Sequence, residues 1–107
     1  MSALGTDATT ALLRALRDTL RTANFLNFER VHSCEWASIT FSGARHEVTL
    51  RLEGEGADAA ANRFAAGLDA TEFRLRGHIL ADIALVAREP AGEGWRLSLE
   101  ALTVEDA

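Results

Sequence analysis

The chain has 107 residues, 48% of them hydrophobic and 25% charged, which are ordinary values for a globular protein and exclude a disordered chain. We therefore expect one domain spanning residues 1–107. The formal net charge of −5 disfavours nucleic-acid binding, and the absence of lysine and tyrosine excludes Schiff-base lysines, P-loop lysines and tyrosine nucleophiles.

The first predicted element is an amphipathic helix over residues 7–23. Its apolar stripe recurs at helical spacing and consists of Leu13, Leu16, Leu20 and Ala23. Thr6 or Asp7 can cap the N-terminus with a side-chain oxygen. The opposite side is rich in arginine and is expected to face solvent, with Arg14 and Asp18 at the separation of an i,i+4 ion pair.

A β-hairpin is predicted over residues 25–54. Ile39 and Phe41 alternate with polar residues in its first strand, and residues 42–45 have turn chemistry with one glycine. Alternation in the second strand involves Val48, Leu50 and Leu52. Apolar residues of both parities precede Ile39, which indicates a bulge or a bend.

A second helix over residues 57–68 follows a glycine-containing connector at 54–56. Its apolar face keeps helical spacing throughout and consists of Ala57, Ala60, Ala61, Phe64, Ala65 and Leu68. Residues 72–104 then form a second predicted hairpin with its turn at residues 90–94, where Pro90 cannot donate to a strand ladder.

The order helix, hairpin, helix, hairpin predicts an α+β fold: a two-layer αββαββ sandwich with a four-stranded antiparallel sheet and both helices on one face. The two halves, 7–54 and 57–104, align at an offset of 47 residues, with Cys34 on Ala81. This alignment suggests an internal duplication, although two amphipathic hairpins would match about as well by chance.

The second face of the sheet is predicted to be partly apolar. Pairing Arg88 with Arg96 puts the odd-numbered residues from Phe73 to Ala87 under the helices, together with Trp95, Leu97 and Leu99. The far face then receives Arg74, Arg76, His78, Leu80, Asp82, Ala84, Val86 and Arg88, opposite Arg96, Ser98, Glu100, Leu102 and Val104. An open apolar face usually marks a partner surface. Alternatively, a bulge or the C-terminal tail turns its apolar residues inward.

Few residues suggest chemistry. The spacing of the three histidines matches no common metal motif, and His46 is expected to be a solvated residue beside a turn. Cys34 has no neighbouring cation in the sequence and is interpreted as a buried packing residue. Glu35 and Asp82 would lie on one face if the halves are related, either as an acid–base pair or as ion-pair partners of nearby arginines; we favour the ion pairs.

We therefore expect a small non-catalytic protein that binds itself or a partner through the second face of its sheet. The predicted interface residues of this homodimer are Ile39, Phe41, Leu80, Val86, Leu102 and Val104. The alternative is a binder of a small, possibly anionic molecule, or a minor enzyme using carboxylates at a dimer seam. Its predicted site residues are Glu35, Trp36, Arg76, His78, Asp82 and Arg96.

No cofactor, metal or nucleic acid is expected, and no membrane association. The first residues lack the basic and apolar regions of a secretory signal, and charges interrupt every apolar run before it could span a bilayer. A single cysteine agrees with a reducing compartment. These observations together predict a cytoplasmic protein.

Overall fold

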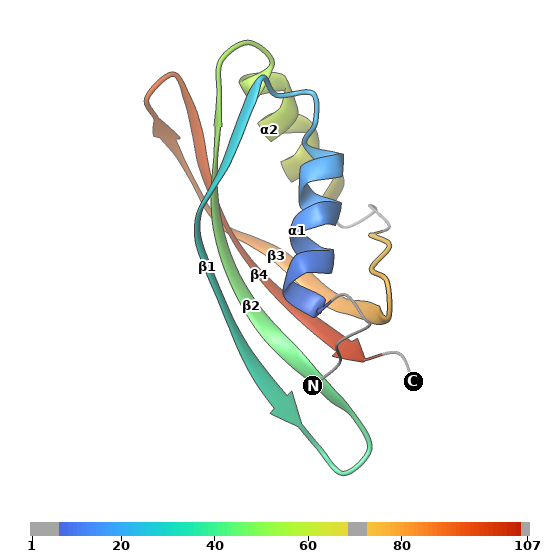
Figure 1. The fold of residues 1–107 in the computed structure, drawn as a ribbon. Helices are drawn as coiled ribbons and strands as arrows, with labels where there is room; N and C mark the ends of the chain where they lie inside the picture. Colours follow the sequence, from blue (N-terminus) through green and yellow to red (C-terminus); the bar gives the residue numbers. More distant parts are fainter. Residues whose placement is uncertain (1–6, 69–72, 106–107) are drawn as a thin grey trace.

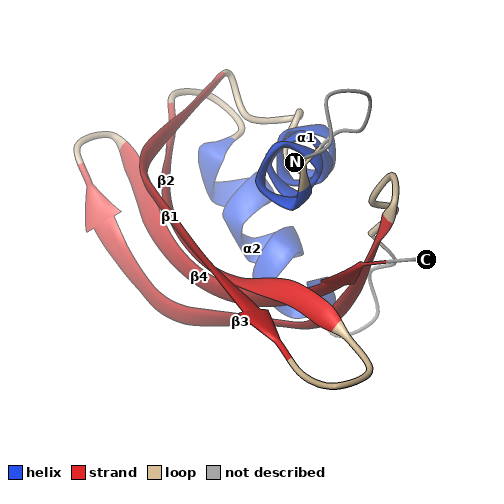
Figure 2. Ribbon diagram, turned by 60° about the horizontal axis from the view of Figure 1, so that its bottom comes forward, coloured by secondary structure: helices blue, strands red, loops and turns tan. Residues whose placement is uncertain are grey.

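The computed structural model describes residues 7–68 and 73–105. Its elements in chain order are α1 (Ala8–Thr19), β1 (Phe25–Ala37), β2 (Ser42–Glu53), α2 (Ala57–Gly67), β3 (His78–Ala91) and β4 (Gly94–Glu105). The strands form one antiparallel sheet in the order β1-β2-β4-β3. Both helices lie inside the curve of this sheet, and no described helix covers its convex side (Figure 1, Figure 2). The predicted αββαββ sandwich is therefore confirmed.

Helix α1 begins where the sequence predicts and ends earlier. The amide of Thr10 donates to Asp7 Oδ1 at 2.7 Å, so Asp7 is the N-cap; Thr6, the other candidate cap, lies outside the described residues. The helix stops at Thr19 rather than at residue 23. Its buried face consists of Ala11, Leu12 and Leu16, with Leu20 following at the C-cap, whereas the predicted Leu13 and Ala23 are only half-buried.

Helix α2 follows its prediction closely. Gly56 occupies the N-cap with φ of 90°, a left-handed conformation that favours glycine, so the glycines before α2 provide backbone freedom as expected. The helix buries the small side chains of its predicted face, with Phe64 as the bulky anchor. The hydrophobic core lies between the helices and the two central strands, where Val48, Leu50 and Leu52 meet Leu97 and Leu99.

The first hairpin turns earlier than predicted. Its strands are joined by residues 38–41, so Ile39 and Phe41 belong to the turn and residues 42–45 belong to β2. A Cβ at Gly43 would collide with the main-chain carbonyl of Thr103 on β4 and would lie 2.9 Å from Cζ2 of Trp36. Gly43 is therefore needed for close approach within the sheet and not for a turn. The predicted bulge is present, between Phe28 and Arg30.

The second hairpin is shorter than predicted and contains two bulges. Strand β3 begins at His78, so Phe73 and Leu75 precede it; residue 72, the predicted start, lies outside the described residues. The predicted register holds in mid-strand, where Asp82 pairs with Leu102, and shifts by one residue on each side. The shifts lie between Leu80 and Asp82 and between Leu85 and Ala87.

These bulges overturn part of the predicted face assignment. Leu80 pairs with the buried Thr103 and packs against the core, whereas Ile79 is 53% exposed. Arg88 pairs with Leu97 instead of Arg96, and its Nη2 donates to Asn62 Oδ1 on α2. Ala81 and Ala87, expected beneath the helices, are exposed.

No helix in the described part of the chain is long and apolar enough to cross a membrane.

Candidate binding surfaces

The carboxylates proposed as a pair do not meet. Glu35 lies on β1 opposite the buried Ala44, and Asp82 lies on β3 opposite Leu102. Strands β1 and β3 are the two edges of the sheet, separated by three strand spacings of about 4.8 Å each. The register also places the two residues on opposite faces. Glu35 and Asp82 therefore do not form a shared acid–base site within one subunit, and neither forms an ion pair within the described residues.

The other predicted ligand-binding residues are also dispersed. Trp36 lies against Gly43 near the end of β1, and its Nε1 is buried without a hydrogen-bond partner in the described chain. His78 is the half-buried first residue of β3 and pairs with Glu105. Arg76 precedes that strand. The structure therefore does not assemble the predicted six residues into one site.

The convex face is apolar at one end. In one row of the sheet, Trp36 pairs with Gly43, Gly43 with Val104, and Val104 with Ile79, so three apolar side chains lie across all four strands. Leu102 lies two residues along β4 on the same face, and the β1–β2 turn beside this row carries two exposed residues. The convex face carries Trp36, Ile79, Leu102 and Val104, and the exposed turn residues Ile39 and Phe41 follow Trp36 along the chain; we call these six residues the convex patch.

Both signs of charge border the convex patch. Leu102 has Arg45 as its partner on β2 and Asp82 as its partner on β3. In the next row, Glu47 pairs with Glu100. A rim with a cation on one side and an anion on the other can complement a copy of itself across a two-fold axis.

The opposite end of the convex face is an ionic network. Glu29 accepts from Arg96 Nε at 2.7 Å and from Arg51 Nη1 at 3.4 Å, and Arg96 Nη1 also contacts Glu89 Oε1 at 3.2 Å. Arg51 Nη2 donates to Glu53. The hydrogen bond from Arg96 lowers the pKa of Glu29. Because Arg96 already binds two carboxylates, it is not a free clamp for an anionic ligand.

A chain of polar side chains crosses the helix-facing side of the sheet. His46 is 1% exposed, which corrects its assignment to a solvated turn. Ser33 Oγ lies 2.7 Å from His46 Nδ1 and 2.8 Å from Thr9 Oγ1, and His46 Nε2 lies 2.9 Å from Thr103 Oγ1. Thr103 Oγ1 donates to the carbonyl of Ala44. Sequence analysis missed this cluster because its members lie on four separate elements.

The carbonyl at the end of this chain fixes the direction of every proton. Since Thr103 donates to Ala44, it accepts from His46 Nε2–H, and Nδ1 then accepts from Ser33. Ser33 and His46 thus have the spacing of a nucleophile and a base. However, burial lowers the pKa of His46, and a threonine hydroxyl replaces the carboxylate that would stabilise an imidazolium. The arrangement is a hydrogen-bond chain that links α1 to three strands of the sheet.

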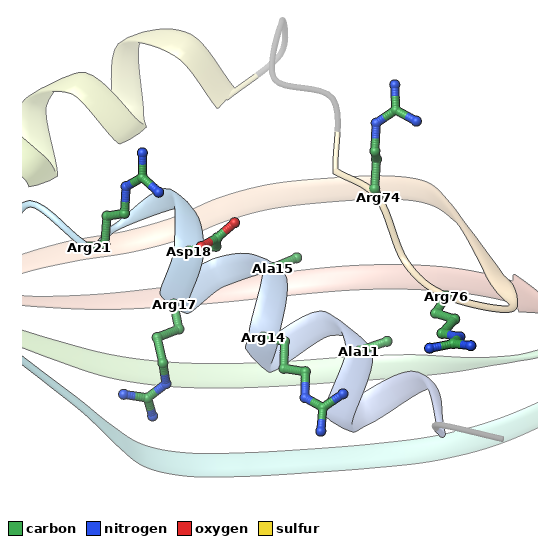
Figure 3. A pocket seen from close by; sticks show the side chains of 8 residues that line it. All are labelled: Ala11, Arg14, Ala15, Arg17, Asp18, Arg21, Arg74 and Arg76. Atoms are coloured by element: carbon green, nitrogen blue, oxygen red, sulfur yellow. The ribbon is translucent and has the colours of Figure 1, made fainter. Parts of the chain in front are cut away.

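A basic groove lies between α1 and the segment before β3. Its cavity of about 450 Å³ is lined by Ala11, Arg14, Ala15, Arg17, Asp18, Arg21, Arg74 and Arg76. Figure 3 shows the two alanines on the side of α1 that faces Arg76. The spacing of arginines on α1 could be read from the sequence, but the approach of residues 74 and 76 from the other side of the groove could not.

The structure also bears on the predictions for the cysteine and for metal binding. Cys34 is exposed, which corrects its interpretation as a buried residue. Over residues 7–68 and 73–105, no three histidine, cysteine, aspartate or glutamate side chains are grouped so that they could hold a metal ion.

Comparisons of the chain with known protein families, curated proteins and solved structures found no match.

Proposed function

We propose that this protein functions as a homodimer whose subunits meet through the convex patch. The observation that carries the proposal is the apolar row Trp36, Val104 and Ile79 on a sheet face that no described helix covers. A sheet face turned only to water is normally polar along each strand. A second copy of the chain is the occupant we favour, because the rim of the patch carries both signs of charge.

The exposed area is sufficient for association. Ile39, Phe41 and Ile79 have exposures of 105%, 57% and 53%. A large apolar side chain exposes on the order of 150 Å² when bare, so these three and the partly exposed remainder of the patch amount to about 400 Å² per subunit. Burying this area on two subunits releases roughly 20 kcal/mol before association costs of about 4–15 kcal/mol. A polar rim of similar area brings the interface to the usual size of about 800 Å² per subunit.

This interface is narrower than the one predicted from sequence. Leu80 is excluded because it packs in the core. Val86 is as exposed as Ile79 but lies seven residues further along β3, or about 23 Å, and falls outside the patch.

We also propose a cytoplasmic location, which the exposed thiol of Cys34 supports because a reducing compartment keeps such a thiol unpaired.

Light scattering during size exclusion, with sedimentation velocity over a concentration series, tests the proposal. The wild-type chain should have twice its monomer mass, and Ile79→Arg should weaken dimerisation at least about 100-fold because it places a charge in an apolar contact. Val86→Arg is the matched control, on the same strand with the same exposure of 53%, and should remain dimeric. A wild-type monomer at about 100 μM, or equal effects of the two variants, contradicts the proposal.

A further inference from the structure

The basic groove concentrates positive charge on an acidic protein. Its five arginines and one aspartate carry four net positive charges, whereas the whole chain carries −5, so the remaining residues carry nine net negative charges. The groove is therefore a local concentration of positive charge that can attract an anion.

Residues 7–68 and 73–105 provide no ion-pair partner for the arginines of the groove. Arg14, Arg21, Arg74 and Arg76 form no ion pair or hydrogen bond within the described chain, and the Arg14–Asp18 pair predicted from their spacing is not formed. The guanidinium of Arg17 lies 5.2 Å from the ring centre of Phe28, a cation–π contact that leaves its charge intact.

The cations also repel one another. Arg14 and Arg17 lie three residues apart on α1, where like charges destabilise a helix, and Arg21 follows one residue beyond the C-cap Leu20. In Figure 3, Arg14 and Arg17 project from one side of α1 and Arg21 from the other. An anion bound over Ala11 and Ala15 would relieve this repulsion. The small alanine side chains leave room for it between the helix and Arg76.

We propose that this groove binds a compact oxyanion with several negative charges, of the oligophosphate class. Guanidinium groups bind phosphate oxygens through paired hydrogen bonds, and several arginines around one groove suit several phosphoryl groups. A volume of about 450 Å³ fits a small molecule. A long nucleic acid is disfavoured because it would extend from the groove over the negatively charged remainder of the surface. The lining residues include no aromatic side chain on which a base could stack.

Calorimetric titration with sodium tripolyphosphate at about 50 mM salt tests this site. We expect one ligand per chain, affinity that falls as salt rises, and comparable affinity for ATP because the groove recognises its phosphates. Arg14→Gln/Arg76→Gln should weaken binding at least about tenfold. The control Arg30→Gln/Arg63→Gln also removes two exposed cations, but from outside the groove, and should stay within about twofold of wild type.

Three results would overturn the proposal: no binding at about 1 mM tripolyphosphate, equal weakening in both double variants, or tighter binding of a ten-nucleotide DNA strand than of tripolyphosphate. Thermal unfolding of each variant without ligand establishes that it is folded. The outcome does not depend on dimerisation, because the groove and the convex patch share no residue.

Discussion

Lowering the pH should destabilise the fold through His46. Burial is the main cause that lowers the pKa of His46 below 6.5, the neighbouring His78 adds to this effect, and Asp7 opposes it. Below pH 6.5 the unfolded chain therefore takes up a proton that the folded chain does not. The stability due to this difference is complete above pH 6.5 and is lost as the pH falls through the folded pKa. The slope is at most about 1.4 kcal/mol per pH unit, giving a loss of at most about 2 kcal/mol by pH 5.

Urea unfolding at pH 8, 7, 6 and 5 measures this slope. His46→Gln should lower stability by about 1–3 kcal/mol at pH 8, because the imidazole bridges Ser33 and Thr103, and should remove the slope between pH 7 and 5. His32→Gln changes an exposed histidine on β1 and should retain the slope. A wild-type stability that is flat from pH 8 to 5, or the same slope in His46→Gln, would refute the reasoning.

Two further substitutions test the packing around this chain and the β3 register, each by urea unfolding of dilute protein. Thr103→Val should lower the free energy of unfolding by about 1–3 kcal/mol, because His46 Nε2–H and the Ala44 carbonyl lose the Thr103 hydroxyl. The control Thr49→Val, on the convex face, should change it by less than about 0.5 kcal/mol. Leu80→Ala should cost about 1–2 kcal/mol because Leu80 packs on the core, and Ile79→Ala less than about 0.5 kcal/mol because Ile79 is exposed. Equal costs would contradict the register set by the bulge between Leu80 and Asp82.

The helix faces, strand alternation and capping residue that depend on neighbouring residues could be predicted from the sequence. The apolar face of α2 was predicted correctly for Ala57, Ala60, Ala61 and Phe64, which recur at positions i, i+3, i+4 and i+7, whereas Ala65 is only half-buried. In β2 and β4 the alternation is regular, and Leu50 and Leu97 are both buried; that the two residues pair across these strands was not predicted. The cap at Asp7 was likewise predictable, because an aspartate side chain reaches the amide of the third helical residue within the same turn.

Features that depend on distant partners could not be predicted in this way. Gly43 has the composition of a turn, and only the approach of β4 and of the Trp36 ring explains why a glycine lies within a strand. His46 shares the parity of Val48 and Leu50, so alternation places it on the buried face, but the turn expected at residues 42–45 led to its assignment to solvent. Its partners, Ser33 and Thr103, are 13 and 57 residues away. The basic groove likewise joins residues of α1 to Arg74 and Arg76, more than fifty residues further along the chain.

The β3 bulges do have a local signal, and it bears on which apolar residues lie on the convex face. Two apolar doublets, Ile79–Leu80 and Leu85–Val86, adjoin the two register shifts. In a regular strand each doublet would put one apolar residue on either face, and the single alternation assumed from the sequence assigned Ile79 inward and Leu80 outward. The bulge between Leu80 and Asp82 reverses this first pair, so that Leu80 joins the core and Ile79 is left exposed beside Val104. The extra residue in β3 thus decides which residue of the doublet joins Val104 on the convex face.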